Sequence, residues 1–474
     1  MISDFIRCLL ACALLLFGGM GFVLFTGAVR RWRPAALFGL SWNSGLVLLY
    51  LMGNILTRSN PFQGKWALWI GGLCLASGLA AACLSKLRPK WEAEEKQRSG
   101  RTAHILICLC LAFLFLKGVL VLSLLCRMPV IDSDAANLER WVGLAKELAF
   151  RGFVPEVVSQ SYERFSPSLL PAFIAGYLSR WRDNLVCIPW FFTWMSILAL
   201  AWSTMRTLTR NSLLAAGVAF LFASVPLSIV HIIRPGFSDL LLAGFLVSAV
   251  SVFLLTMYHR REFTVRSCLL LLLFLLGAAL TKKEGIIWVV WLIVTAVCFG
   301  LNQRWRISWQ RILTVLFLAG GTVVLSYVFL HNWIRMSLIS DSRVKWLFEF
   351  NYSDRATWMF FKTLMSSNGF GLLYWIFFGL SAGLLLRTRD VSRRILVVFN
   401  LLPFVFLFYF CCFTGNVAIT ERGTNIGRLL LPLHSFVLPV FPLAWELYKE
   451  AGKNLRVPAP VPRKRKRPAN RNRG

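Results

Sequence analysis

Charged residues are scarce in this sequence, and acidic residues are the scarcest. Only 15% of the 474 residues are charged, and Asp and Glu together number 21. A typical soluble chain carries about 25% charged residues. Hydrophobic residues make up 57% of the chain, and the mean hydropathy is +0.64. The composition therefore excludes an ordinary soluble enzyme and predicts an all-α polytopic membrane protein.

Motifs for metal and nucleotide binding are missing. The 12 cysteines lie within or at the ends of apolar segments, with no Cys-x-x-Cys pair and no Cys/His ligand spacing. This argues against a zinc site and a disulfide framework, and we interpret the cysteines as buried thiols. There is no Walker sequence and no Rossmann fingerprint, so a nucleotide-sugar site on a soluble domain is not supported.

Basic residues are in large excess, with 52 Lys and Arg and a net charge of +31. In a soluble protein this excess would indicate nucleic-acid binding. Here the basic residues fall between apolar stretches, where they orient helices in the membrane, and we expect no nucleic-acid partner. The run Arg463–Arg467 near the C-terminus is expected to attract anionic membrane lipids.

Apolar stretches long enough to form membrane helices recur about thirteen times. A span needs about 20 apolar residues. The first stretch is too long for a removed signal peptide and lacks a small-residue cleavage site. The stretches are Phe5–Val29, Ala35–Leu56, Trp66–Leu87, His104–Cys126, Leu185–Met205, Ser212–Ile233, Phe237–Tyr258, Ser267–Leu280, Gly285–Leu301, Ile312–Trp333, Gly369–Leu386, Ile395–Phe413 and Arg428–Tyr448.

The basic loops alternate along the chain, so they all fall on one side of the membrane. The positive-inside rule makes that side cytoplasmic. An odd number of spans then puts the N-terminus outside and the C-terminus inside. We divide the chain into a three-helix region (1–103), a main membrane domain (104–448, with a first external loop at 127–168) and a basic cytoplasmic tail (449–474).

The first external loop carries two aspartates at the membrane boundary. Pro129 ends the preceding span, and Asp132 and Asp134 follow it. Leu138 and Trp141 begin an apolar face at helical spacing, which predicts an amphipathic helix on the membrane surface. Asp134 would cap that helix in a purely structural interpretation. An Asp-x-Asp pair alone is a weak metal signal, so we name no metal ligand.

Three further external turns carry ionisable residues. His231, Arg234 and Asp239 surround the turn after Ser212–Ile233, where Asp239 is expected to cap its helix or to pair within the bundle. Lys282, Lys283 and Glu284 form another turn, where the lysines either snorkel or bind an anion. Arg428 opens the last apolar stretch. Aromatic residues of the outer loops are best explained as an interfacial belt.

These pieces resemble the GT-C superfamily of membrane glycosyltransferases, which includes protein O-mannosyltransferases and aminoarabinose transferases. The sequences around Asp132, around Arg234-Pro-Gly-Phe-Ser-Asp239, at Thr281-Lys-Lys-Glu-Gly285 and at Asn425-Ile-Gly-Arg428-Leu-Leu-Leu-Pro432 are similar to that family's motifs in type and order. The resemblance covers about His104 to Tyr448. Asp-Ser-Asp stands where Asp-Glu is usual, and Leu429 stands where Tyr is usual.

The resemblance implies an inverting transfer of a sugar from a polyprenyl-phosphate donor. The acceptor hydroxyl needs a general base, for which Asp132 is the first candidate and Asp134 the second. The leaving phosphate needs fixed positive charge rather than a proton. Lys282, Lys283, Arg234 and Arg428 are the candidates for that charge, and Glu284 and His231 are candidates for substrate contact.

Other functions stay open. A transporter or flippase of an envelope lipid or glycan suits the number of spans, but ionisable residues are nearly absent from mid-span positions apart from Lys117. A polymerase or ligase of envelope glycans is a further alternative. The sugar, the envelope acceptor and any divalent cofactor are not identified by the sequence. Compact loops favour a bacterial inner membrane.

Overall fold

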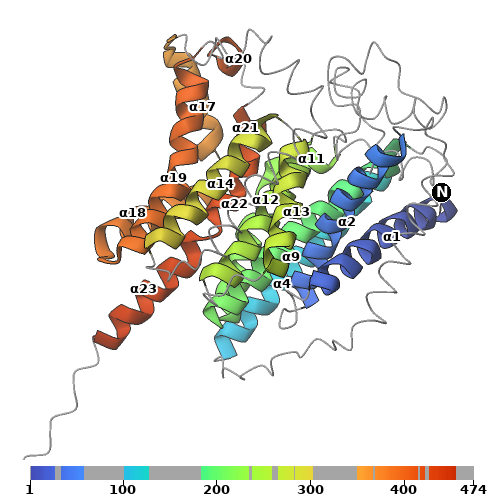
Figure 1. The fold of residues 1–474 in the computed structure, drawn as a ribbon, viewed down its shortest axis with the longest axis horizontal. Coiled ribbons are helices and arrows are strands. Elements are labelled where there is room, and N and C mark those ends of the chain that lie inside the picture. The colour runs from blue at the N-terminus through green and yellow to red at the C-terminus, as the bar shows by residue number, and fades with distance from the viewer. Residues whose placement is uncertain are drawn as a thin grey trace, which may run out of the picture.

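The computed structural model describes most of the predicted helices. The described residues are 2–26, 34–57, 101–127, 183–233, 238–258, 265–281, 283–302, 350–366, 369–414, 417–421 and 426–454. Within these ranges the chain forms helices joined by turns, with no strand (Figure 1). The fold class predicted from composition is confirmed as far as an all-α membrane protein.

Seven described helices are long and apolar enough to cross a membrane, or eight if the bent pair α10–α11 counts as one span. The predicted stretches 66–87 and 312–333 lie outside the described residues. The helices and short helical turns are α1 (Ile2–Thr26), α2 (Pro34–Thr57), α4 (Arg101–Arg127), η2 (Asp183–Cys187), α9 (Ile188–Thr209), α10 (Ser212–Ala223), α11 (Pro226–Ile233), α12 (Asp239–Phe253), η3 (Leu254–Tyr258), α13 (Val265–Thr281), α14 (Lys283–Asn302), α17 (Asp354–Met365), α18 (Leu373–Arg387), α19 (Val391–Cys412), α20 (Val417–Glu421), α21 (Ile426–Leu430), η4 (Leu431–Leu433), α22 (His434–Val437) and α23 (Val440–Asn454).

Helix α12 is the centre of the bundle. Every residue from Asp239 to Phe253 is buried. Its sequence is apolar on all sides and rich in small residues, which is the pattern of a helix surrounded by other helices. It contacts α2, α9, α13, α14 and the η4–α22 segment, while α1 and α23 lie toward opposite sides of the molecule (Figure 1).

A buried polar cluster links α2 to α9 and α12. The Asn43 amide donates to Ser196 Oγ at 3.1 Å, to Ser248 Oγ at 2.8 Å and to the Gly244 carbonyl at 3.3 Å. One residue earlier, the Trp42 indole N–H donates to Thr193 Oγ1 at 2.9 Å. Hydrogen bonds of this kind hold membrane helices together where burial of apolar surface gives no preference between lipid and protein.

The predicted single span Ser212–Ile233 is broken in the structure. Helix α10 ends at Ala223, α11 begins at Pro226, and the two axes differ by 55°. Proline at the start of α11 has no N–H to donate into a continuing helix and clashes with the turn before it. The apolar composition of the stretch did not predict this break, because hydropathy is the same for a continuous helix and for a broken one.

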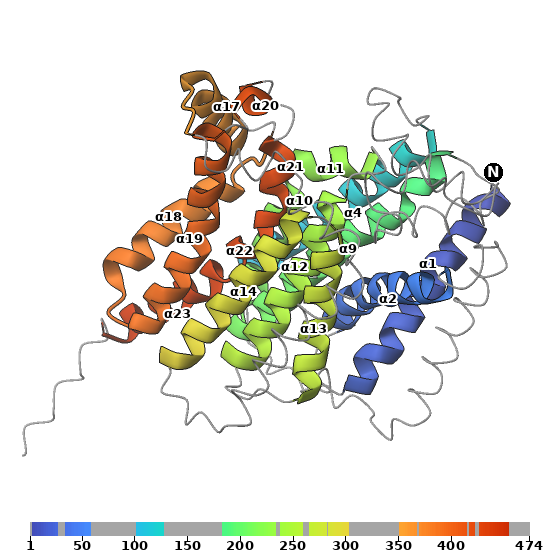
Figure 2. The same cartoon turned by 45° about the horizontal axis from the view of Figure 1, so that its top comes forward.

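The helix ends fall into two groups. At one end, the Trp445 indole of α23 donates to Thr209 O at the end of α9, beside Arg206 and Arg210. We call this the basic end. Helices α11, α21, α17 and α20 gather at the opposite end, which we call the non-basic end (Figure 2). For the described basic residues Arg206 and Arg210, this grouping agrees with the alternation predicted from the sequence.

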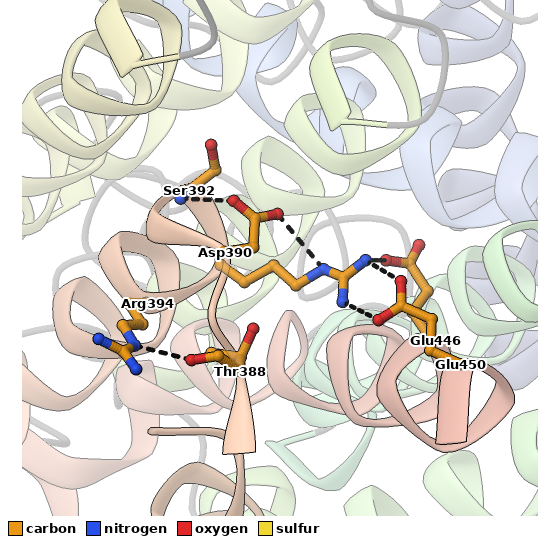
Figure 3. Close-up of polar contacts among 7 residues, drawn as sticks. Thr388, Asp390, Ser392, Arg394, Glu446 and Glu450 are labelled. Carbon is orange, nitrogen blue, oxygen red and sulfur yellow. Dashed lines mark hydrogen bonds and ion pairs between the residues drawn. The ribbon is translucent and has the colours of Figure 1, made fainter. Parts of the chain in front are cut away.

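Ion pairs join α19 to α23 at the basic end (Figure 3). The Arg393 guanidinium donates to both Glu450 carboxylate oxygens, at 2.6 and 2.8 Å, and lies 3.7 Å from Glu446. Asp390 accepts from the Ser392 N–H at 2.9 Å and so caps α19. These contacts link the start of α19 to α23 through a bidentate pair.

Arg393→Ala is expected to cost only about 0.5–1 kcal/mol, because Glu446 and Glu450 are 37% and 52% exposed and their charges are screened. The measurement is the thermal midpoint of the purified protein at low and at high salt. The loss should shrink at high salt. The exposed neighbour Arg389→Ala is the control, and an equal loss there would assign the effect to net charge rather than to the ion pairs.

Candidate functional site

His231, Asp239 and Arg428 come together at the non-basic end of the bundle, where the α11–α12 junction meets the distant helix α21. Arg428 Nε lies 3.1 Å from Asp239 Oδ2, and His231 Nδ1 lies 4.0 Å from the same oxygen. His231 comes from the end of α11, Asp239 from the start of α12 and Arg428 from α21. We call these three residues the outer cluster. Within this cluster, Asp239 and Arg428 are 189 positions apart in the sequence.

The outer cluster combines two buried groups with one that reaches the surface. The side chains of His231 and Asp239 are 2% and 3% exposed, whereas that of Arg428 is 28% exposed. A carboxylate in an apolar interior requires a partner, and Arg428 supplies the positive charge. Asp239 is also the first residue of α12, where the helix dipole favours an acidic side chain.

Glycines set the close approach of the surrounding helices. A Cβ on Gly427, next to Arg428, would lie 2.8 Å from Leu227 Cδ2 of α11. A Cβ on Gly285 would lie 2.0 Å from the Ala278 carbonyl oxygen and 3.3 Å from Leu242 Cδ1 of α12. These contacts bring α21 against α11, and the start of α14 against α13 and the first turn of α12.

The turn between α13 and α14 therefore lies at the same end as the outer cluster. Helix α14 begins at Lys283, and Glu284 occupies its first turn, half-buried. Lys282 and the side chain of Lys283 lie outside the described residues. The N-terminus of a 20-residue helix carries partial positive charge, which favours negatively charged groups near the start of α14.

A cap formed by α17 and α20 packs beside α21 (Figure 2). Ser353 caps α17 and its hydroxyl also contacts the Glu421 carboxylate of α20. The Tyr352 hydroxyl donates to Asp354 Oδ1 at 2.7 Å, and this hydrogen bond raises the pKa of Tyr352. Trp358 is 66% exposed on the outward face of α17. The cap therefore lies next to α21, the helix that carries Arg428.

The structure thus brings together two of the predicted site residues, His231 and Arg428, through Asp239. Asp239 was expected only to cap or to pair, and the pairing is present. The signal for its importance was an acidic residue at the start of an otherwise apolar stretch. Asp132, Asp134, Arg234 and Lys282 lie outside the described residues.

No family model matches the chain, and no curated protein or solved structure does either. Among the described residues, no group of three or more His, Cys, Asp or Glu side chains is placed to hold a metal ion. The outer cluster presents one partly exposed guanidinium, that of Arg428. An arginine held by a buried carboxylate keeps a fixed orientation, and a guanidinium pairs with phosphate or carboxylate oxygens through its planar set of N–H donors.

Proposed function

We propose that the chain is an integral-membrane glycosyltransferase that moves a sugar from a polyprenyl-phosphate donor to an envelope acceptor on the non-cytoplasmic face. The observation that carries the proposal is the Asp239–Arg428 pair. It fixes a partly exposed guanidinium at the end of the bundle where the α13–α14 turn and the start of α12 also lie. In this proposal, the phosphate of the lipid donor reaches Arg428 from the surrounding membrane.

The proposed reaction is a displacement at the anomeric carbon. The acceptor hydroxyl attacks that carbon, the bond from the carbon to the phosphate oxygen breaks, and the phosphate leaves as an anion. The hydroxyl proton passes to a carboxylate, for which Asp132 is the first candidate and Asp134 the second. Arg428, with Lys282, Lys283 and Arg234, stabilises the negative charge that builds on the leaving oxygen.

The architecture that goes with this proposal has thirteen spans and a GT-C-like arrangement of the first external loop. The N-terminus then lies outside and the basic tail inside, in a bacterial inner membrane. Two features support it: the described basic residues Arg206, Arg210 and Arg393 lie near α23 at one end of the bundle, and the resembling motifs around Asp239, Gly285 and Arg428 meet at the other.

A mass comparison of envelope glycans and glycolipids tests the proposal. The strains carry wild type, a deletion, Asp132→Asn, Asp134→Asn or Arg428→Met, with matched protein levels in the membrane. We expect Arg428→Met and one of the two aspartate variants to reproduce the sugar loss of the deletion. Arg393→Ala, at the opposite end, is the control and should match wild type.

The alternative is a transporter of an envelope lipid or glycan, and one observation favours it. The bent pair α10–α11 carries a break within the bundle, and the mid-span residue Lys117 contacts it. Discontinuous helices of this kind form binding sites in many transporters. If the deletion alters the glycans while both aspartate variants match wild type, the transferase proposal is wrong and transport is the better explanation.

A further inference from the structure

We propose that Lys117 is a positioning residue for the outer cluster: its ammonium holds the break between α10 and α11 and thereby sets the place of α11. The proposal concerns a contact within the fold and does not depend on the reaction proposed above. It rests on four observations: an isolated charge on an apolar helix, the carbonyl that this charge meets, a second support on the other side of the break, and the contacts that α11 makes with the outer cluster.

Lys117 is the one charged residue of α4 between His104 and Cys126. Its neighbours are apolar, and those on the outward face of α4, such as Leu116 and Leu120, are 65% and 59% exposed. A lysine in the apolar part of a membrane helix is unfavourable to insert. A leucine would serve better if the position had only to face lipid, so the charge needs a partner.

The partner is the last carbonyl of α10. Lys117 Nζ donates to Ala223 O, and it also lies 5.6 Å from the centre of the Phe113 ring. Two earlier carbonyls near the end of α10 accept hydrogen bonds from Ser224. Its N–H donates to Phe220 O at 2.8 Å, and its Oγ donates to Leu221 O at 2.8 Å. The carbonyl end of a helix carries partial negative charge, so a cation is favoured there.

The other side of the break has its own support. The Leu227 N–H, in the first turn of α11, donates to Gly369 O at 3.3 Å. Gly369 belongs to the turn before α18, in which Gly371 has a φ of +59°. Backbone N–H and C=O groups freed by a broken helix are unfavourable in hydrocarbon unless other segments supply hydrogen-bond partners. Helix α4 and the 369–372 turn therefore share the task of keeping α11 at its 55° angle.

The position of α11 decides the geometry of the outer cluster. Helix α11 has only eight residues. Near its N-terminus Leu227 packs against Gly427, one residue before Arg428, and near its C-terminus His231 lies beside Asp239. A change in the angle at the break moves both contacts together. Lys117 thus acts on His231 and Arg428 through α11, at a distance from either residue in sequence.

Hydrogen exchange of the full chain in lipid nanodiscs, followed by mass spectrometry, tests the proposal. We expect Lys117→Met to speed the exchange of amides in 226–233 and 426–430 by at least about tenfold, with little change in α1 and α2. Lys117→Arg keeps the cation and should stay within about threefold of wild type. Lys117→Gln keeps N–H donors without charge and should fall between the two.

Gly118→Ala is the matched control, because a Cβ at Gly118 has no neighbour within 4 Å. It should exchange like wild type. Wild-type exchange of 226–233 in both Lys117→Met and Lys117→Gln would overturn the proposal. Faster exchange spread evenly over α1, α2 and α23 would also overturn the proposal, and so would exchange in Lys117→Arg that is as fast as in Lys117→Met. Either result would assign Lys117 a general role in stability.

Discussion

Arg428→Met is expected to lower the free energy of unfolding by about 3 kcal/mol and to slow sugar transfer at least about 100-fold. The loss of stability follows from the burial of Asp239, whose side chain is 3% exposed and would lose a contact of 3.1 Å with Arg428 Nε. The loss of transfer follows from the proposed role of the guanidinium at the leaving phosphate.

The double variant Arg428→Met/Asp239→Leu separates these two effects. Replacing both members of a buried ion pair by apolar residues of similar size is often close to neutral, since no charge is left without its partner. We expect the double variant to unfold within about 1 kcal/mol of wild type and still to fail in transfer. The measurements are unfolding in detergent by thermal or denaturant titration, and glycan mass analysis in the host.

Each outcome bears on a different claim. Wild-type stability of the Arg428→Met single variant would contradict the ion pair. A stable double variant that still transfers sugar would agree with the ion pair seen in the structure, but it would exclude Arg428 as the phosphate ligand. Arg393→Met at the opposite end is the matched control. Its partners are partly exposed, so its cost should be about 1 kcal/mol or less.

Gly45→Ala is expected to destabilise the protein by about 3 kcal/mol. A Cβ at Gly45 would lie 2.0 Å from the Leu15 carbonyl oxygen of α1, and one at Gly19 would lie 1.8 Å from the Ser41 carbonyl oxygen of α2. Both clashes are with backbone, so a shift of a side chain does not relieve them and the two helices must separate. Small residues at such crossings let membrane helices pack closely.

The matched control is Gly383→Ala on α18, where a Cβ has no neighbour within 4 Å. Since alanine favours a helix by about 1 kcal/mol over glycine, this variant should be neutral or slightly more stable. Comparing the thermal midpoints of the two variants isolates the effect of the α1–α2 contact. A similar change in both would show that the helices do not cross as closely as in this structure.

Much of the helical pattern followed from the sequence alone. Long apolar runs must form helices in a membrane, because hydrocarbon offers no partner for backbone N–H and C=O groups. The predicted stretches in the described residues are accordingly helical, and the apolar, small-residue sequence of α12 is that of a helix enclosed on all sides. Proline at 226 is the sequence feature that accounts for the break in Ser212–Ile233, which hydropathy alone did not predict.

Contacts between distant segments were decided only by the tertiary structure. Sequence placed His231, Asp239 and Arg428 near external helix ends, but three helix ends in a bundle of this size have many possible neighbours. The pairing of Asp239 with Arg428 and the contact of Lys117 with Ala223 depend on which helices are adjacent. Hydropathy does not encode adjacency. It is fixed by close glycine contacts such as those at Gly45, Gly285 and Gly427, and by the few polar side chains that must find partners inside the bundle.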